Sequence, residues 1–138
     1  MVISAPDGRQ PWVVEAGDPR GQPVLVQHGT PGSGHLYRPH AADARDRGIR
    51  LLGYDRPGYG RSTPQPGRSV ADCAADVRAI ADALRVDRVA IWGVSGGGPH
   101  ALACAALLPD LVVAVASLAS LAPYGSPGLD YFGGMGEE

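Results

Sequence analysis

Hydrophobic positions along the chain form short continuous runs, separated by longer stretches in which apolar residues have helical spacing. The continuous runs are typical of strands buried on both faces, and they lie at residues 24–26, 49–54, 88–92 and 111–118. Apolar residues three and four positions apart predict helices over residues 37–47, 69–84 and 95–108. A turn at residues 6–9 joins two further strand-like segments, at residues 2–3 and 12–16.

The alternation of strands with helices predicts the fold class. Strands that are joined by helices form a parallel sheet with helices on both faces, so we expect an α/β protein with a mostly parallel sheet. The run at residues 112–118 is the sixth strand of this count. Functional loops lie at the carboxyl ends of such strands, and three glycine-rich loops follow strands there, at residues 28–34, 55–62 and 93–98.

Composition and charge narrow the class of protein. A chain of 138 residues that is 44% apolar and 19% charged is typical of a single globular domain. Its net charge of −2 would not hold a nucleic acid or an anionic membrane. The two cysteines, Cys73 and Cys104, lack the spacing of a metal site. We therefore expect no metal, no cofactor and no nucleic-acid partner.

The N-terminal segment and the longest apolar stretch bear on the location of the protein. No basic segment followed by an apolar run opens the chain, so no signal peptide is predicted. The stretch at residues 102–123 is about as long as a membrane span, but Pro109 and Asp110 interrupt it. We expect a soluble, cytoplasmic protein.

The segment Gly93-Val94-Ser95-Gly96-Gly97 lies between a predicted strand and a predicted helix. This pattern is typical of the tight turn that presents a nucleophilic serine above a sheet. Side chains two residues before and after the serine would collide with the backbone, which favours glycine at both positions. The N-terminus of the following helix stabilises negative charge on a reacting carbonyl. We predict that Ser95 is a nucleophile.

The loop at residues 28–34 is the predicted partner of this turn. Acyl transfer needs at least two N–H donors directed at the oxyanion, and we expect them from the backbone of Gly96 and of Thr30. Gly29 lets the backbone approach closely. His28 has two interpretations, as the catalytic base or as a histidine that braces the loop through its own hydrogen bonds, and the second is favoured.

Three motifs, HGTPGSG, YDRPGYGRS and WGVSGGGPH, follow one another in this order. Together they resemble the α/β-hydrolase family, above all its capped members of the proline-iminopeptidase-like and esterase-like kind. The resemblance covers residue 17 to about residue 135. It implies Ser95 as the nucleophile and the N–H groups of Gly96 and Thr30 as the oxyanion hole. It also implies that the loop of residues 55–62 is a structural brace, in which Asp55 accepts internal hydrogen bonds.

The sequence departs from the family pattern after the strand at residues 112–118. Family members generally continue into a helical cap and then supply the catalytic acid and the histidine. The histidines of this chain all lie upstream of that strand, at His28, His35, His40 and His100. We expect His100 on the helix body below the turn, badly placed to meet the Ser95 hydroxyl. His35 and His40 lie in or after the loop at residues 28–34, where either could approach the pocket, and Asp110 is expected at the wrong end of the sheet. No residue is assigned as the catalytic acid or base.

The predicted sheet ends on an apolar strand. We expect residues 1–122 to be the N-terminal part of the hydrolase core, and residues 123–138 to be either the start of a cap or a disordered tail. A sheet that is truncated after its sixth strand leaves residues 112–118 as an uncovered edge. Such an edge favours self-association or pairing with a partner chain.

The expected function is hydrolysis of an ester or a small amide or peptide bond, with the acid and the histidine missing from this chain. A serine at the nucleophile position disfavours epoxide and haloalkane hydrolysis, which use a carboxylate there in this family. The alternative is a catalytically inactive remnant, or one chain of a split enzyme, that acts through association.

Overall fold

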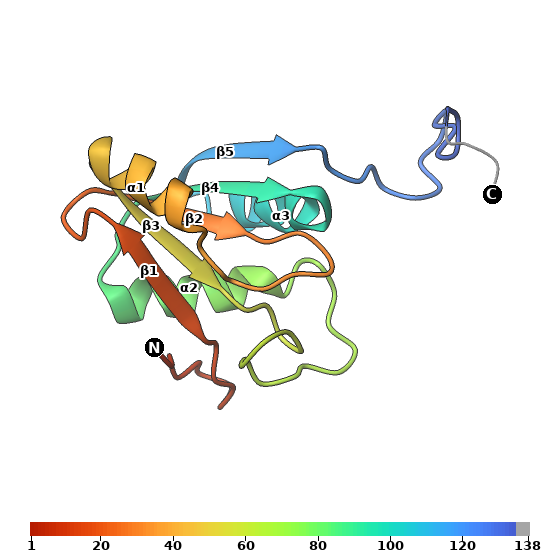
Figure 1. Cartoon of the computed structure of the whole chain (residues 1–138). Coiled ribbons are helices and arrows are strands. Elements are labelled where there is room, and N and C mark those ends of the chain that lie inside the picture. The colour runs from red at the N-terminus through yellow and green to blue at the C-terminus, as the bar shows by residue number, and fades with distance from the viewer. Residues whose placement is uncertain (135–138) are drawn as a thin grey trace.

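The computed structural model describes residues 1–134 of the chain (Figure 1). Within them, five strands form one sheet: β1 (Val13–Gly17), β2 (Gln22–Gln27), β3 (Ile49–Tyr54), β4 (Val89–Val94) and β5 (Val112–Leu118). The helices are α1 (Arg38–Asp46), α2 (Cys73–Leu84) and α3 (Gly98–Leu107), and a 3-10 turn, η1 (Ser95–Gly97), leads into α3. None of these helices is long and apolar enough to cross a membrane.

The strands are arranged in the order β1-β3-β2-β4-β5. The antiparallel strand β1 lies at one edge, and β3, β2, β4 and β5 run parallel to one another. The parallel register brings Trp92 of β4 between Val26 of β2 and Ala116 of β5. This topology confirms the prediction of an α/β protein with a mostly parallel sheet.

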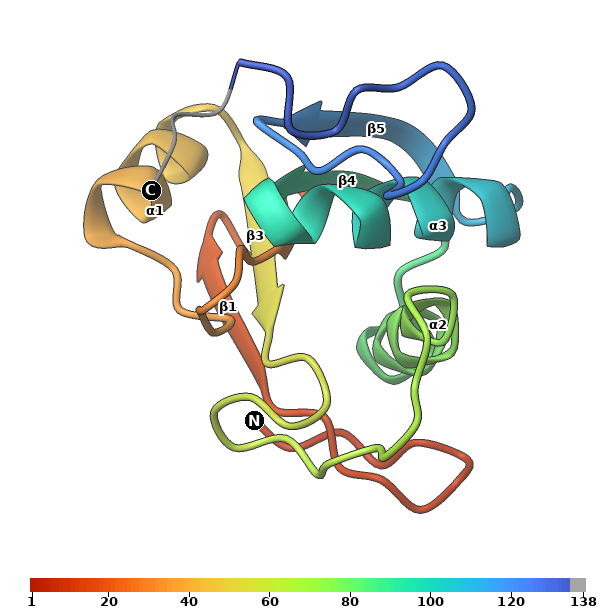
Figure 2. The same cartoon turned by 90° about the vertical axis from the view of Figure 1, so that its right-hand side faces the viewer.

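The helices cover the two faces of the sheet unequally. Helices α2 and α3 lie on one face and α1 on the other (Figure 2). The buried core lies under α2 and α3, where Leu25, Leu52 and Ile91 of the sheet pack with Val77 and Ile80 of α2. Burying each such side chain stabilises the fold by about 1.5–3 kcal/mol. Helix α1, by contrast, contacts β1 and β3.

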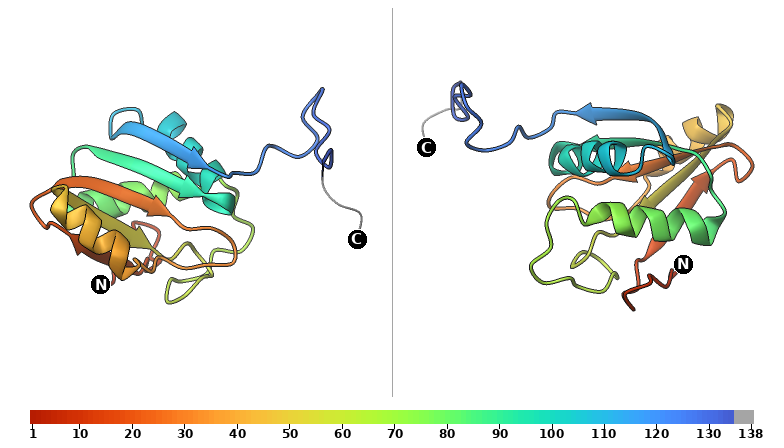
Figure 3. Two further views of the ribbon diagram at one scale, coloured as in Figure 1. Left: turned by 45° about the horizontal axis from the view of Figure 1, so that its top comes forward. Right: turned by 180° about the vertical axis from the view of Figure 1, so that it is seen from behind.

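The uncovered part of the α1 face is a groove. Two adjoining cavities of about 640 and 460 Å³ share Trp92, Leu51 and His40 in their walls. We call this region the α1-side groove. Figure 3 (left) shows α1 over the β1–β3 edge of the sheet only, with β2, β4 and β5 open beside it. Ala116 and Leu118 of β5 line its far side.

The prediction that residues 111–118 form a strand buried on both faces is wrong. Leu111 is buried, but 43% of Val113 and 48% of Leu118 is exposed, because among the described residues β5 has a strand on one side only. The prediction of an uncovered apolar edge is thereby confirmed. Strand β2 is likewise fully buried at Leu25 but only half-buried at Val24, which faces the α1-side groove.

Two further boundaries differ from the sequence-based expectation. The segment at residues 2–3 contributes a single bridge, between Val2 and Trp12, and not a strand. Pro11 interrupts the ladder there because it has no N–H to donate. Helix α2 begins at Cys73 and not at Ser69, whose N–H and hydroxyl both donate to the Asp72 carboxylate at 2.6 and 2.9 Å. That carboxylate closes a turn before the helix.

The segment after β5 extends away from the sheet (Figure 1). Within it, Tyr124 makes edge-to-face ring contacts with Tyr131 and Phe132, at centroid distances of 5.2 and 6.1 Å. Residues 135–138 lie outside the described residues. The division of the chain at residue 122 stays a prediction.

Candidate active site

Ser95 occupies the turn between β4 and α3. Its φ of 51° lies in the left-handed region, a conformation that costs a residue with a side chain about 1–3 kcal/mol. A Cβ on Gly93 would collide with the carbonyl oxygen of Gly97, and a Cβ on Gly97 with the carbonyl oxygen of Gln27 in β2. The two glycines therefore let the turn lie directly on the neighbouring strands, as the sequence pattern predicts.

Ser95 opens onto a cavity of about 630 Å³, which we call the Ser95 cavity. Thr30, Gly96 and His100 share its walls with the serine. The backbone of Thr30 comes close to that of Gly96, because a Cβ on Gly96 would lie 3.4 Å from the Thr30 nitrogen and 2.7 Å from its hydroxyl. The loop after β2 and the turn after β4 thus meet at one point beside the serine.

His28 is held by two hydrogen bonds of its own ring. Its Nε2 accepts the N–H of Arg56 at 3.2 Å, so Nδ1 carries the proton and donates to the carbonyl of Gly29 at 2.8 Å. Burial lowers the pKa of His28 to about 4. The ring is neutral near pH 7 and joins the loop after β2 to the loop after β3.

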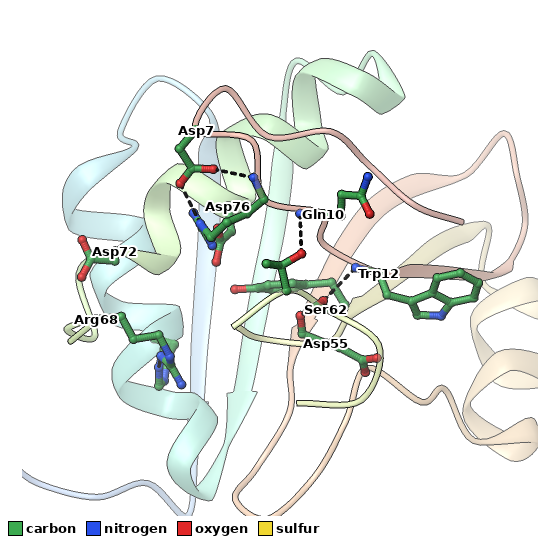
Figure 4. Close-up of polar contacts among 12 residues, drawn as sticks. Asp7, Gln10, Trp12, Asp55, Ser62, Arg68, Asp72 and Asp76 are labelled. Carbon is green, nitrogen blue, oxygen red and sulfur yellow. Dashed lines mark hydrogen bonds and ion pairs between the residues drawn. The ribbon is translucent and has the colours of Figure 1, made fainter. Parts of the chain in front are cut away.

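Asp55 follows β3 and orders the loop of residues 55–62. One carboxylate oxygen accepts the N–H of Gly34 at 2.7 Å and the other accepts the N–H of Arg61 at 2.8 Å. The Ser62 hydroxyl donates to the Asp55 carbonyl at 2.5 Å and accepts the N–H of Trp12 at 2.8 Å (Figure 4). The carboxylate is thus occupied by backbone donors and makes no hydrogen bond to Ser95.

His100 lies nearer to Ser95 than the sequence suggested, because it lines the Ser95 cavity from the first turn of α3. Its Nδ1 bonds to the carbonyl of Gly96 at 2.9 Å, and its Nε2 lies 3.4 Å from a guanidinium nitrogen of Arg68. Burial, followed by the charge of Arg56, lowers the pKa of His100 to about 4. Both ring nitrogens are therefore engaged away from the serine hydroxyl.

The remaining candidates for base and acid lie elsewhere. His35 and His40 line the α1-side groove and stack edge-on against Tyr37, at centroid distances of 5.1 and 5.8 Å. Asp110 pairs with Arg78 at 2.6 Å. Residues 1–134 contain no cluster of three or more side chains able to hold a metal ion.

Three side chains in the wall of the Ser95 cavity were not predicted as site residues: Arg56 and Tyr59, which lie within the motif YDRPGYGRS, and Arg68. Arg56 is fully buried and donates to the carbonyl of His28 and, at 3.1 Å, to the hydroxyl of Thr30. Its guanidinium carbon lies 5.3 Å from the centre of the Tyr59 ring. Arg68 comes from the loop before α2, where no periodic pattern places a side chain.

Comparison with known proteins agrees with this geometry. The model of a family described as "alpha/beta hydrolase fold" matches residues 22–136. The chain belongs to the α/β-hydrolase family. The resemblance that three short motifs predicted is confirmed, and with it a fold that serves hydrolytic enzymes.

Individual members of the α/β-hydrolase family match most of this chain. It is 32% identical to a proline iminopeptidase of Xylella fastidiosa over 79% of this chain and 36% of that protein. It is 31% identical to a non-heme chloroperoxidase of Streptomyces lividans, over 88% of this chain and 44% of that protein. An esterase from Exiguobacterium antarcticum superposes with a TM-score of 0.78 at 28% identity, over 89% of this chain and 46% of the esterase. The chain thus spans less than half the length of each of these proteins.

Proposed function

We propose that this chain carries the nucleophile and the oxyanion hole of a serine hydrolase that acts on ester or small amide bonds. The observation that carries the proposal is the strained backbone of Ser95, with a φ of 51° at the carboxyl end of β4, beside a 630 Å³ cavity. Strained backbone of this kind clusters at active sites. The esterase and peptidase relatives support hydrolysis as the reaction class.

The proposed reaction begins with attack of the Ser95 hydroxyl oxygen on the carbonyl carbon of the substrate. The carbonyl oxygen becomes an oxyanion, and the N–H groups of Gly96 and Thr30 stabilise it. Loss of one such donor typically lowers the rate by about 10²–10³-fold. The close approach of these two backbone segments supports their joint role.

A serine hydroxyl is a weak nucleophile until a base removes its proton. None of the four histidines makes a hydrogen bond to Ser95 within the described residues, and His28 and His100 use both ring nitrogens elsewhere. We therefore propose that the catalytic base and acid come from residues outside these 138. The isolated chain should then react slowly but selectively at Ser95.

Labelling with a fluorophosphonate tests the proposal directly. The purified chain should take up one equivalent of probe at Ser95, detected by mass spectrometry of its peptides. Ser95→Ala should abolish the label, and Ser126→Ala, which removes a hydroxyl from the segment after β5, should not. A chain that is folded but neither takes up the probe nor releases p-nitrophenol from p-nitrophenyl butyrate would exclude activity of the isolated chain.

A second candidate function is association through β5. The observation that favours it is the exposed apolar edge strand, in which 43% of Val113 and 39% of Val115 is accessible. Under this proposal a second copy of the chain pairs with β5, and Ser95 need not react. Labelling therefore separates the two functions.

A further inference from the structure

The Ser95 cavity is lined by cations and by no carboxylate. Of its eleven described lining residues, Arg56 and Arg68 are charged, and none is aspartate or glutamate. A substrate that reaches Ser95 must therefore enter the field of two guanidinium groups. In a partly buried site such a field is screened less than at an open surface.

The charge of Arg56 is not neutralised by any neighbouring carboxylate in the part of the chain that the structure describes. Its terminal nitrogens donate to neutral acceptors, namely the carbonyls of His28 and Gly29 and the hydroxyl of Thr30. Its Nε is buried without a hydrogen-bond partner. A fully buried cation with an unused donor is costly unless an anion comes near it.

Arg68 is half-buried and likewise forms no ion pair among residues 1–134; its recorded polar contact is with the ring of His100, at 3.4 Å. The carboxylates nearest along the chain are committed to other partners. Asp72 accepts two hydrogen bonds from Ser69, and Asp76 pairs with Arg9 at 2.7 Å. Figure 4 shows the Arg68 side chain directed away from the Asp72 carboxylate. Apart from the guanidinium nitrogen near His100, the donors of Arg68 are thus free to bind a ligand.

We propose that the Ser95 cavity selects substrates that carry an anionic group, which Arg68 binds directly while Arg56 adds its charge from the cavity wall. The inference rests on the proposed function, because it names the substrate class of the same nucleophile. A guanidinium offers several N–H donors to a carboxylate, and such charge-assisted bonds are stronger than neutral ones. The same two cations repel a substrate with a free ammonium group. The site should therefore prefer esters that carry an anionic group to peptides with a free amino terminus.

Equilibrium binding to the full 138-residue chain tests the selection without any reaction. Butyrate and butyramide have nearly the same shape and differ in charge, so they are titrated in parallel while backbone amide resonances are followed by NMR. Butyrate should bind about tenfold or more tightly than butyramide, shift the resonances of Thr30 and Gly96, and lose affinity as salt is raised. Equal affinity of the two ligands would overturn the proposal.

Two variants with the same change of charge show whether the preference for butyrate arises at Arg68. Arg68→Gln should remove most of the preference for butyrate. The matched control is Arg88→Gln, whose side chain is exposed at the start of β4, at the opposite end of that strand from Ser95; it should keep the preference. Equal loss in both variants would mean attraction by overall charge and would overturn a site at Arg68.

The outcome can be separated from that of the proposed function. Fluorophosphonate labelling at Ser95 without a preference for butyrate would leave the serine hydrolase standing and overturn the anionic substrate class. A preference for butyrate without labelling would exclude a reactive Ser95 in the isolated chain and leave the cavity shown only as an anion-binding site.

Discussion

At the scale of single residues, the turn around Ser95 combines one strained φ with two glycines that have no room for a side chain. Gly97 has an ordinary helical φ of −80°, so a side chain there would add steric overlap with the backbone carbonyls of Gln27 and His28 but no strain in φ. Gly8, in contrast, has a φ of 85° and nothing within 4 Å of its would-be Cβ. Substitution of Gly97 therefore tests steric overlap, and substitution of Gly8 tests backbone strain.

We expect Gly97→Ala to displace the turn and to reduce fluorophosphonate labelling of Ser95 by about 10²-fold, since a shift near 1 Å has effects of that size. The same overlap should destabilise the chain by roughly 1–3 kcal/mol in urea unfolding. Gly8→Ala should cost about 1–2 kcal/mol through strain alone and leave the labelling rate unchanged. Unchanged labelling of Gly97→Ala would contradict a role for close contact at the turn.

The two buried histidines predict how stability depends on pH. Burial lowers the pKa of His28 and of His100 to about 4, from an ordinary 6.5. Between these values the unfolded chain binds more protons than the folded chain, so the free energy of unfolding falls as pH is lowered from 6.5 to about 4. Above pH 6.5 the two histidines make their full contribution to the free energy of unfolding, and that contribution no longer changes with pH.

Urea unfolding across that pH range, with variants of single histidines, measures the effect. His100→Gln should reduce the slope of unfolding free energy against pH, because one of the two displaced titrations is removed. His40→Gln is the matched control, because the His40 ring lies exposed on α1. A slope that His100→Gln leaves unchanged would show that the ring titrates normally in the folded chain.

At the scale of elements, an ion pair ties the N-terminal segment to α2. Arg9 contacts Asp76 at 2.7 Å, and the Asp76 side chain is almost completely buried. Burial raises the pKa of Asp76, while Arg9 opposes that shift. Removing the cation leaves a buried carboxylate without its partner, which is the costly way to break such a pair.

We expect Arg9→Gln to destabilise the chain by about 3–5 kcal/mol, measured by urea unfolding at neutral pH. The comparison is Arg47→Gln, which breaks an exposed pair with Asp43 within α1 and should change stability by roughly 0.5 kcal/mol or less. Similar losses in the two variants would mean that burial adds nothing to the Arg9–Asp76 pair.

The sequence predicted the elements better than their surroundings. Short continuous runs of apolar residues predict β2, β3, β4 and β5, because a strand inside a parallel sheet has apolar side chains on both faces. The start of α2 was missed because the Asp72 carboxylate accepts two hydrogen bonds from Ser69 and closes a turn, which the spacing of apolar residues does not reveal. The exposure of β5 depends on which elements cover it, and local periodicity does not contain that information.

The same reasoning explains what was found and missed in the candidate site. The position of Ser95 between Gly93 and Gly97 could be predicted because the tight turn requires those residue types, whereas the catalytic roles of Ser95, Gly96 and Thr30 stay predictions. Arg68 reaches the Ser95 cavity because long-range bonds shape its loop, among them the bond from the Gln10 N–H to the Thr63 hydroxyl at 3.1 Å (Figure 4). No short motif records such contacts.

At the scale of the whole molecule, coverage of the sheet is asymmetric. One face is buried under α2 and α3, and the other is covered by α1 over β1 and β3 but open across β2, β4 and β5 (Figures 2 and 3). The parallel ladder ends at β5 within the described residues, with backbone N–H and C=O groups along its free side. Such an edge is a template for another strand.

The proposal of association through β5 predicts that sedimentation velocity shows dimers or larger species, which dissociate on dilution. Val115→Lys should increase the monomer fraction, because a charged side chain on an edge strand opposes pairing. Val2→Lys makes the same change at a position that is 52% exposed in the N-terminal segment and should have no effect. A wild-type chain that stays monomeric at all concentrations would contradict association.

The fluorescence of Trp92 reports on the α1-side groove, because its ring lies in the groove wall. Trp12 lies against the guanidinium of Arg61, whose carbon is 4.5 Å from the ring centre, whereas Trp92 forms part of the wall of the α1-side groove. In Trp12→Phe, intrinsic fluorescence would come from Trp92 alone. Water leaving the groove would then move the emission to shorter wavelengths, while a ligand in the Ser95 cavity, whose wall does not include that ring, would leave the emission where it is.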